Sequence, residues 1–333
     1  MKREQLRRET GAYVPKVRFR VARYDPKTKS SWWQDYEIEV DKYTSVAVAL
    51  QRVREEKDPT LAYRPLCKMG VCGNCAVKIN GKPRLACLTN ALEAAEEGGG
   101  TVVIEPLDGM PVIRDLIVDR GDFERRMFGV KPYLIPKEEV LKEDKWYPML
   151  PAVQMDLWSA AQCVWCGICY SVCPVAKVSE EFAAPHALVK LYRFAYDPRD
   201  SLGKRRIYLN EKSLWMCVAC KNCGTSCPKN LKHGLRFKRM RNDDVASPKT
   251  EYAEKAVRHV LATINSIAKY GRADEVEIFV STGVAEAVAD ALPRIIRGGW
   301  KRRPYRPKPG EADERAVEAF RAAVSALLRG SGQ

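Results

Sequence analysis

The chain has 333 residues, which is long enough for two or three domains that each bury a core of their own. Its 46% hydrophobic and 30% charged residues exclude a largely disordered chain and a protein built of membrane spans. Lysine and arginine outnumber aspartate and glutamate by 57 to 42, and this net charge of +15 favours anionic partners: nucleic acid, an acidic protein or a lipid surface.

The first hundred residues predict a small β-rich domain. Apolar and charged residues alternate over 17–21 and 36–40, which indicates two half-buried strands that pair as a hairpin. From residue 44 to 57 the apolar residues recur at helical spacing. Beyond a cysteine-rich loop, Asn80-Gly81 predicts a hairpin turn and 101–104 a last strand. Strands wrapped round one helix are typical of a β-grasp ferredoxin domain.

The middle of the chain predicts a helical domain with an internal repeat. Prolines and a glycine make 105–111 a linker, and the pattern beyond it is helical. A run of four cysteines that ends in Cys-Pro occurs at 163–174 and again at 217–228. Between the two runs, 187–196 has helical spacing. Two copies of one motif imply a pseudo-symmetric domain.

The last ninety residues contain no cysteine and no motif that we can assign. We expect amphipathic helices over 251–268 and 312–328 and a short strand over 276–280. The stretch 294–308 is densely basic and contains Trp300 and Tyr305. This section is predicted to be a C-terminal extension of unknown role.

The predicted fold class is α+β. The expected domains are a β-grasp 2Fe-2S ferredoxin domain at 1–110, an α-helical ferredoxin domain with two cubane-type clusters at 111–241, and a mostly helical extension at 242–333. The segment 157–176 has no charge and the length of a membrane span, but it holds four cysteines and helix breakers. We therefore predict no transmembrane segment. No apolar stretch follows the twin arginine Arg7-Arg8, so we expect no export signal and a reducing cytoplasm.

The first four cysteines have the spacing of a plant-type 2Fe-2S site. Four residues separate Cys67 from Cys72, two separate Cys72 from Cys75, and Cys87 follows after eleven more. Glycines in this loop allow positive φ angles and a close approach of backbone amides to the bridging sulfides. A zinc knuckle is the alternative, although it normally pairs two elements in which two residues separate the cysteines.

The remaining eight cysteines form two runs of the bacterial ferredoxin type. In two-cluster ferredoxins the fourth cysteine, which precedes proline, ligates the other cluster. We therefore expect two 4Fe-4S clusters with reciprocal ligation, and zinc is again the alternative. The expected ligands are Cys163, Cys166, Cys169 and Cys227 for one cluster, and Cys217, Cys220, Cys223 and Cys173 for the other.

No part of the sequence predicts a catalytic residue. A disulfide framework is a poor interpretation, because such frameworks belong to short secreted chains. The sequence has no dinucleotide-binding glycine motif after a strand. His186, His233 and His259 are the only histidines, and their spacing suggests structural roles. Three clusters without a substrate site predict an electron relay whose catalysis takes place in a partner.

The order of these motifs resembles the iron-sulfur subunit of succinate dehydrogenase and fumarate reductase. The similar segments are 62–89, 104–119, 192–200 and both Cys-Pro runs. The resemblance implies a flavoprotein partner that carries FAD, no FAD in this chain, and a membrane anchor where quinone is reduced. Electrons would pass from FAD through the 2Fe-2S cluster and the two others to quinone, or in reverse. It also implies a peripheral position on the cytoplasmic face of the cell membrane.

Two departures from the family bear on the far end of the relay. Many members lack a cysteine at the position of Cys220 and hold a 3Fe-4S cluster on the residues that match Cys173, Cys217 and Cys223. This sequence supplies the fourth thiolate, so we expect a second 4Fe-4S cluster. The family's usual tryptophan after the first Cys-Pro and histidine after the residue matching Cys217 are absent, so its quinone contacts do not carry over.

Two other functions stay open at this stage. The chain could serve a soluble, thiol-coupled fumarate reductase or a complex of the heterodisulfide reductase kind. It could also bind nucleic acid through its basic runs 232–241 and 294–308, with structural clusters. We prefer to interpret these runs as solvated faces or contacts with a partner subunit, and expect no nucleic acid.

Overall fold

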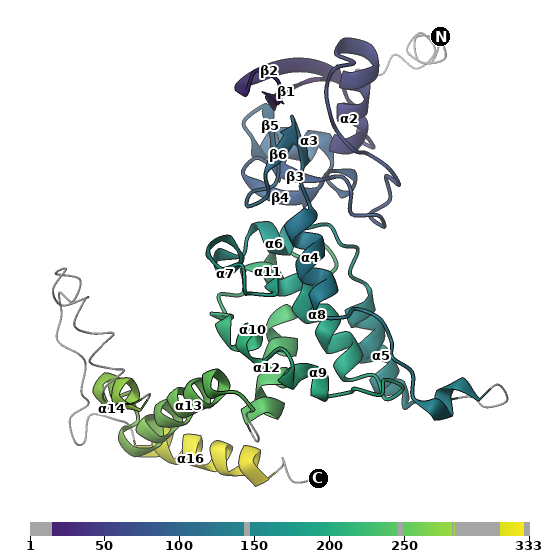
Figure 1. Cartoon of the computed structure of the whole chain (residues 1–333). Coiled ribbons are helices and arrows are strands. Elements are labelled where there is room, and N and C mark those ends of the chain that lie inside the picture. Colours follow the sequence, from purple (N-terminus) through teal and green to yellow (C-terminus); the bar gives the residue numbers. More distant parts are fainter. Residues whose placement is uncertain (1–14, 143–146, 246–248, 282, 284–313, 330–333) are drawn as a thin grey trace. The chain divides into compact units, whose positions relative to one another are not determined.

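The computed structural model describes residues 15–142, 147–245, 249–281, 283 and 314–329. The chain divides into two compact units, Met1–Arg241 and Asn242–Gln333, and each is described by itself. The first unit contains a mixed sheet and a set of short helices, and the second is helical (Figure 1). The predicted α+β fold class is confirmed.

A five-stranded sheet in the order β2-β1-β5-β3-β4 forms the N-terminal part of the first unit. Strands β1 (Lys16–Asp25) and β2 (Ser30–Glu39) pair antiparallel, which confirms the predicted hairpin. Strand β5 (Thr101–Glu105) runs parallel to β1 in the centre of the sheet. Strands β3 (Ala76–Ile79) and β4 (Lys82–Leu85) form the second hairpin. Strands from before and after the cysteine-rich loop therefore lie in one sheet.

Two capped helices cover this sheet. Helix α2 (Val46–Arg52) continues as the wider turn η1 (Val53–Lys57), and together they confirm the predicted helix. Helix α3 (Ala91–Glu97) was not predicted. The side chains of Ser45 and Asn90 accept backbone N–H groups in the first turns of α2 and α3, which satisfies donors that a helix start leaves free. These helices bury the apolar face of the sheet.

The segment after the sheet differs from its prediction. A helical pattern was expected beyond residue 111, but β6 (Val112–Arg114) and β7 (Ile117–Val118) form a two-stranded hairpin first. Asp115 makes the tight turn with a φ of 48°, and its carboxylate accepts hydrogen bonds from Arg23 Nε at 3.0 Å and Ala62 N at 2.7 Å. These long-range bonds favour a turn here over a helix. The expected linker before it is packed, since Leu107 and Met110 are buried.

Short helices make up the rest of the first unit. Helix α8 is the central one, because most of its side chains are buried and α4, α5, α6 and α9 all contact it. It confirms the predicted helix between the two cysteine runs. The helices are α4 (Gly121–Gly129), η3 (Glu138–Leu141), α5 (Pro151–Ala161), α6 (Ile168–Ser171), α7 (Pro174–Val178), α8 (Ala184–Ala195), α9 (Arg205–Tyr208), α10 (Glu211–Met216), α11 (Asn222–Thr225) and α12 (His233–Val245); the η2 turn (Ala86–Leu88) follows β4.

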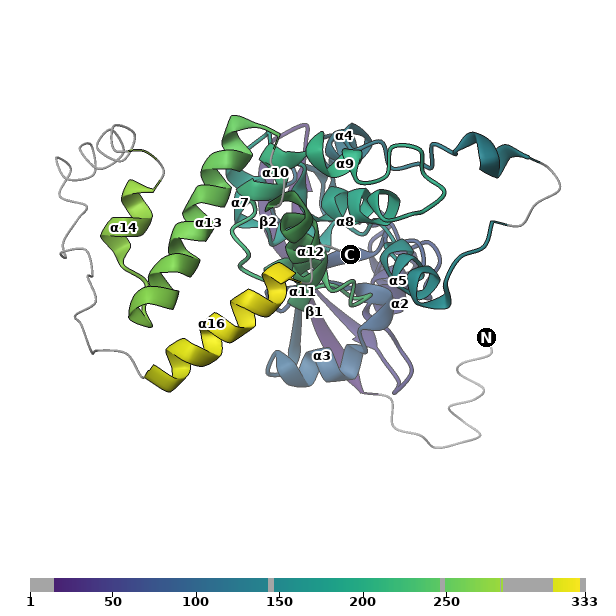
Figure 2. The same ribbon diagram turned by 90° about the horizontal axis from the view of Figure 1, so that it is seen from below.

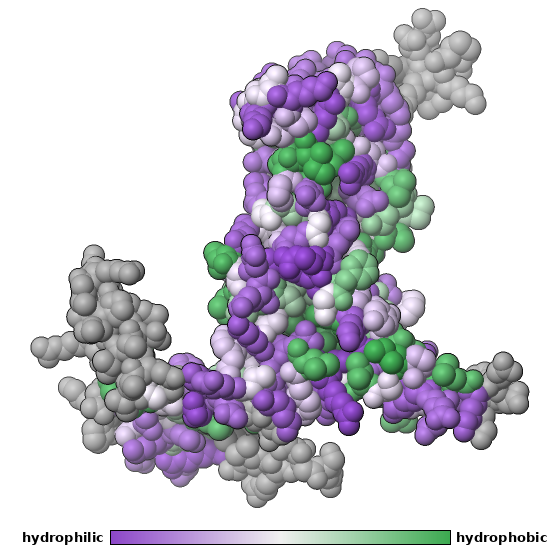
Figure 3. Space-filling view, viewed as in Figure 1, coloured by the Kyte–Doolittle hydropathy of each residue, from purple (hydrophilic) through white to green (hydrophobic). Residues whose placement is uncertain are grey.

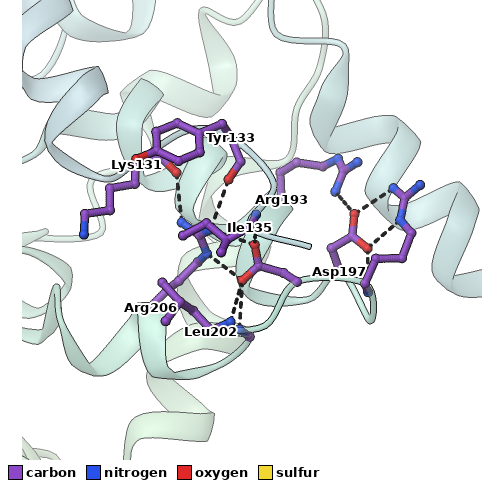
Figure 4. A network of polar contacts seen from close by, with 10 residues as sticks. Lys131, Tyr133, Ile135, Arg193, Asp197, Leu202 and Arg206 are labelled. Atoms are coloured by element: carbon purple, nitrogen blue, oxygen red, sulfur yellow. Dashed lines mark hydrogen bonds and ion pairs between the residues drawn. The ribbon is translucent and has the colours of Figure 1, made fainter. Parts of the chain in front are cut away.

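A buried ion pair fixes the extended segment that precedes η3. The Arg206 guanidinium donates to Asp200 at 2.9 and 2.6 Å and to the carbonyls of Lys131 and Tyr133 at 2.9 and 3.0 Å (Figure 4). Asp200 also accepts the backbone N–H of Ile135 at 3.0 Å. The contacts of Arg206 with Lys131 and Tyr133, and of Asp200 with Ile135, join parts of the chain about seventy residues apart. The contact between Arg206 and Asp200 closes the turn that leads to α9.

The second unit is helical where it is described. Helices α13 (Glu251–Tyr270) and α16 (Glu314–Arg329) confirm the two predicted helices and contact each other (Figure 2). The predicted strand at 276–280 is wrong, because this segment is the helix α14 (Glu275–Val280). The carboxylate of Asp274 accepts the N–H groups of Val276 and Glu277 and so caps the helix. The basic stretch 294–308 lies outside the described residues.

Among the residues that the structure describes, no helix is both long enough and apolar enough to cross a membrane. The uncharged segment 157–176 is divided among α5, α6 and α7.

Candidate metal centres

All twelve cysteines lie in the described part of the chain, and each has a free thiol. They occupy three places in the first unit. The first is the loop between η1 and β3 together with η2, which follows β4. The second is the start of α6 and the loop before it, together with Cys227 beyond α11, and the third is the start of α11 and the loop before it, together with Cys173 beyond α6. Within the described residues, no three His, Cys, Asp or Glu side chains are grouped closely enough to hold a single metal ion.

The first place is an exposed loop in which backbone N–H groups point at the thiol of Cys67. Cys67 Sγ accepts the N–H groups of Val71 at 3.4 Å and Cys72 at 3.3 Å. Backbone hydrogen bonds, that of Met69 first, lower the pKa of the Cys67 thiol to about 6. Hydrogen bonds of this kind stabilise a thiolate, which is the form that ligates iron.

The other cysteines of this place come from both sides of the β3–β4 hairpin. Burial raises the pKa of Cys75 to about 12, and Cys87 and Cys72 lie close enough to add to that rise. Cys87 is part of η2, directly after β4. The structure therefore brings the predicted four together at one end of the hairpin, with two of them buried and two partly exposed.

The second place combines three cysteines of the first run with the last cysteine of the second. Burial raises the pKa of Cys166 to about 12, and Cys163 and Cys227 add to the rise. Burial also raises the pKa of Cys169 well above its usual value, again with Cys166, Cys163 and Cys227 as neighbours. One cavity is lined by all four of these thiols. Cys227 thus lies with the first run rather than with its own.

The third place is the reciprocal arrangement. Burial raises the pKa of Cys223 to about 12, and Cys217, Cys173 and Cys220 follow as causes. Burial also raises the pKa of Cys173, and its neighbours Cys217 and Cys220 add to the rise. Cys220 is exposed, whereas Cys173 and Cys223 are buried. The fourth cysteine of the first run, Cys173, therefore lies with the first three cysteines of the second run.

The two runs share an unusual backbone. Trp165 and Gly167 have φ angles of 56° and 83°, and the residues 54 positions later, Ala219 and Lys221, have 53° and 68°. Left-handed residues that alternate with right-handed ones turn successive N–H groups toward one concave side, which is suited to an anion. Cysteines around such a concavity fit a negatively charged iron-sulfur cluster. The loop of the first place has the same feature at Lys68, Gly70 and Gly73, with φ of 56°, 71° and 72°.

The first and second places touch through Gly73. A Cβ on this glycine would lie 2.3 Å from the carbonyl oxygen of Val164 and 2.9 Å from Cα of Cys166. Arg120 adds a hydrogen bond to the carbonyl of Trp165 from the start of α4. The loop of the first cysteine set is therefore in backbone contact with the loop of the second.

The sequence analysis missed the surroundings of the second place. His186 and His233 both line its cavity together with Phe123 and Leu231. Burial lowers the pKa of His186 to about 3 and that of His233 to about 4, so both rings are neutral near pH 7. They had been interpreted as structural because no ligand-like spacing connects them to the cysteines.

The comparisons with known proteins match both halves of the first unit. The 2Fe-2S iron-sulfur cluster binding domain matches residues 18–125, and the 4Fe-4S dicluster domain matches residues 159–231.

Two curated relatives are each 34% identical to this chain. One is the fumarate reductase iron-sulfur subunit of Mycobacterium tuberculosis, with 66% of this chain and 88% of the relative covered. The other is the succinate dehydrogenase iron-sulfur subunit of Coxiella burnetii, with 68% and 95% covered. A chain of the Mycobacterium smegmatis Sdh1 complex in the apo form is similar at a TM-score of 0.62 and 27% identity, over 72% of this chain and 100% of that one.

Proposed function

The chain belongs to the family of iron-sulfur subunits of succinate dehydrogenase and fumarate reductase and has their electron-transfer role, and from that premise we propose which residues hold which cluster. Cysteine thiolates arranged in fours are the ligands of both 2Fe-2S and 4Fe-4S clusters. The proposed ligands are Cys67, Cys72, Cys75 and Cys87 for a 2Fe-2S cluster, Cys163, Cys166, Cys169 and Cys227 for a 4Fe-4S cluster, and Cys173, Cys217, Cys220 and Cys223 for a second 4Fe-4S cluster.

The observation that carries this assignment is the exchange of Cys173 and Cys227 between the two runs. Burial raises the pKa of Cys169 and of Cys223, and Cys227 adds to the rise at Cys169 as Cys173 does at Cys223, so each lies close to cysteines of the other run. This exchange is the reciprocal ligation of two-cluster ferredoxins, in which the cysteine before proline ligates the other cluster. When bound, the clusters supply three one-electron centres in a row, with the backbone contact at Gly73 between the first and the second.

An apolar rim supports docking of a flavoprotein subunit at the first cluster. Leu66, Met69, Val71 and Leu88 surround this loop and are 69%, 69%, 60% and 56% exposed. In Figure 3 green surface gathers at the edge of the sheet domain, where the loop between α2 and β3 lies in Figure 1. A monomeric protein rarely exposes so many large apolar side chains together. We propose that the FAD-bearing subunit covers this rim.

The third cluster is the proposed exit toward a membrane anchor and quinone. Cys220 is exposed beside Val218, which is 65% exposed, and Val178 after the other Cys-Pro is 85% exposed. An exposed ligand close to an exposed apolar residue suits electron transfer to a partner that covers it. The protein would then be held peripherally at the cytoplasmic face of the membrane by its partner subunits. Quinone contacts would come from residues other than the family's usual tryptophan and histidine.

Iron analysis and Mössbauer spectroscopy of the intact complex test the assignment. We expect about ten iron atoms per chain, two in the 2Fe-2S cluster and four in each of the others. An oxidised 3Fe-4S signal in the freshly isolated wild-type complex would contradict ligation by Cys220. Cys220→Ser is expected to convert only the third cluster to the 3Fe-4S form. Val218→Ser, which places the same side chain on an exposed neighbour, is the matched control and should leave all three clusters unchanged.

Assays on purified membranes test the partners. Co-purification with an FAD-containing subunit and a membrane anchor, together with succinate-dependent quinone reduction or quinol-dependent fumarate reduction, is the expected result. A complex that stays in the soluble fraction and reduces fumarate only with thiols would instead support the thiol-coupled alternative.

A further inference from the structure

His233 is completely buried, and neither of its ring nitrogens has a hydrogen-bond partner among the described residues. It is the first residue of α12, six positions after Cys227. Its ring lies against Phe237, with the centroids 6.0 Å apart. It also lines the cavity of the second place, where the four thiols of the proposed middle cluster meet.

Such an arrangement needs a partner for the imidazole. Buried polar groups are hydrogen-bonded in the great majority of cases, because an unsatisfied one loses its hydration without compensation. The cavity wall next to His233 offers Phe123, Val164 and Leu231, whose side chains accept no hydrogen bond. The other lining residues are the four cysteines, Trp165, Gly167, His186, Pro228 and Lys229, and none of them pairs with a ring nitrogen of His233. A cluster held by the four cysteines would bring sulfur acceptors into this cavity.

We propose that His233 donates a hydrogen bond from its neutral imidazole to a sulfur of the middle 4Fe-4S cluster and so raises the reduction potential of that cluster. This inference rests on the proposed assignment of Cys163, Cys166, Cys169 and Cys227 to one cluster. Reduction adds an electron to a centre that is already negative, and a donor to its sulfur stabilises the reduced form more than the oxidised form. His233 is then a positioning and tuning residue of the relay.

His186, the other histidine of the cavity, cannot do the same. Its Nε2 lies 2.8 Å from the carbonyl oxygen of Phe123. A carbonyl oxygen only accepts, so Nε2 carries the single proton of the neutral ring and Nδ1 is left as an acceptor. Its ring also stacks on Phe123, with the centroids 3.9 Å apart. Of the two histidines, only His233 has an N–H left for sulfur.

The helix that carries His233 is anchored independently of any cluster. Arg236, one turn further along α12, donates to the Ser159 hydroxyl and forms an ion pair with Asp156 at 3.7 Å, both on α5. Arg239 reaches the same carboxylate at 3.1 Å. These contacts fix α12 against α5, so the imidazole is held at the cavity before a cluster is bound.

The test is a redox titration of all three clusters in the purified complex, followed by EPR. His233→Phe keeps a flat ring but removes the donor, and we expect only the middle cluster to shift to a more negative midpoint potential. His233→Gln restores an N–H and is expected to move the potential back toward the wild-type value. His259→Phe, on an exposed histidine of the second unit, is the matched control. An unchanged middle potential in His233→Phe, or an equal shift of all three clusters, overturns the proposal.

If the variant does not fold, a measurement on the wild-type complex tests whether His233 donates a hydrogen bond to the middle cluster. Pulsed EPR of the reduced complex, with the protein labelled with ¹⁵N-histidine, should show a nitrogen coupled to the middle cluster and an exchangeable deuteron after transfer to D₂O. His186→Phe should leave the deuteron coupling in place. Absence of the nitrogen coupling refutes the role of His233, whereas absence of the middle cluster's own signal refutes the cluster assignment instead.

Discussion

Replacing Gly73 by alanine tests whether the first two cysteine loops depend on their backbone contact. An alanine at a φ of 72° costs about 1–2 kcal/mol, because its Cβ crowds the carbonyl of its own residue. The Cβ would also lie 2.3 Å from the Val164 carbonyl oxygen and 2.9 Å from Cys166 Cα, both of them backbone atoms. The loops must open by at least 0.7 Å to bring the closest contact to 3.0 Å. Overpacking of this kind costs a further ~1–3 kcal/mol.

Gly81→Ala is the matched control for this change. Gly81 has a φ of 74°, but no atom lies within 4 Å of the position of its Cβ. We therefore expect Gly81→Ala to lower the free energy of unfolding by about 1–2 kcal/mol and Gly73→Ala by about 2–5 kcal/mol. Only Gly73→Ala should weaken the magnetic interaction between the reduced 2Fe-2S cluster and its neighbour in EPR spectra. Equal losses of stability and equal spectra for the two variants would refute the reasoning.

Three further predictions concern ion pairs in the first unit, each measured by unfolding of the holoprotein. Burial alone would raise the pKa of Asp197, but hydrogen bonds from Arg199 and Arg193 together outweigh it and the pKa falls to about 2. The resulting stability of about 2 kcal/mol is present above pH ~4 and lost as the pH falls through 2, and Asp197→Asn should remove about this much at pH 7, where the acid-labile clusters are intact. Asp200→Asn leaves the buried Arg206 without its counter-charge, and we expect a loss of about 3–5 kcal/mol, against a much smaller loss when both residues are replaced by apolar ones. Arg20→Ala, which removes an ion pair whose side chains are 52% exposed, should cost less than about 1 kcal/mol.

The sequence predicted those parts of the fold that depend on patterns among neighbouring residues. The alternation in β1 and β2 and the Asn80-Gly81 turn are local patterns, and all three are in the structure. Helix α3 also had a readable start, since Asn90 caps it and Glu93 lies in its first turn, but this signal was overlooked. In α14 the mostly apolar segment 276–280 was predicted to be a strand, and the cap at Asp274 favours the helix. Between β6 and β7 a turn bound by residues far away in sequence replaced the expected helix.

The same distinction applies to the candidate site. Cysteine spacing predicts ligands because the loop that holds a cluster is itself local, and the reciprocal position of Cys227 follows from the Cys-Pro motif. What surrounds the thiols is not local. Gly73 meets Val164 across ninety-one positions, and His186 reaches the carbonyl of Phe123 across sixty-three. No spacing rule connects such residues, so only the folded chain shows them.

Burial along the three centres explains why a donor matters most at the middle one. The proposed first cluster has the exposed loop of Cys67, and the proposed third has the exposed Cys220. Cys169, a proposed ligand of the middle cluster, is buried, and the cavity around it is walled largely by apolar side chains. A cluster in apolar surroundings is harder to reduce, because the added negative charge is poorly solvated. One buried N–H from His233 therefore has more influence here than a donor at either end, where partner subunits and solvent also contribute.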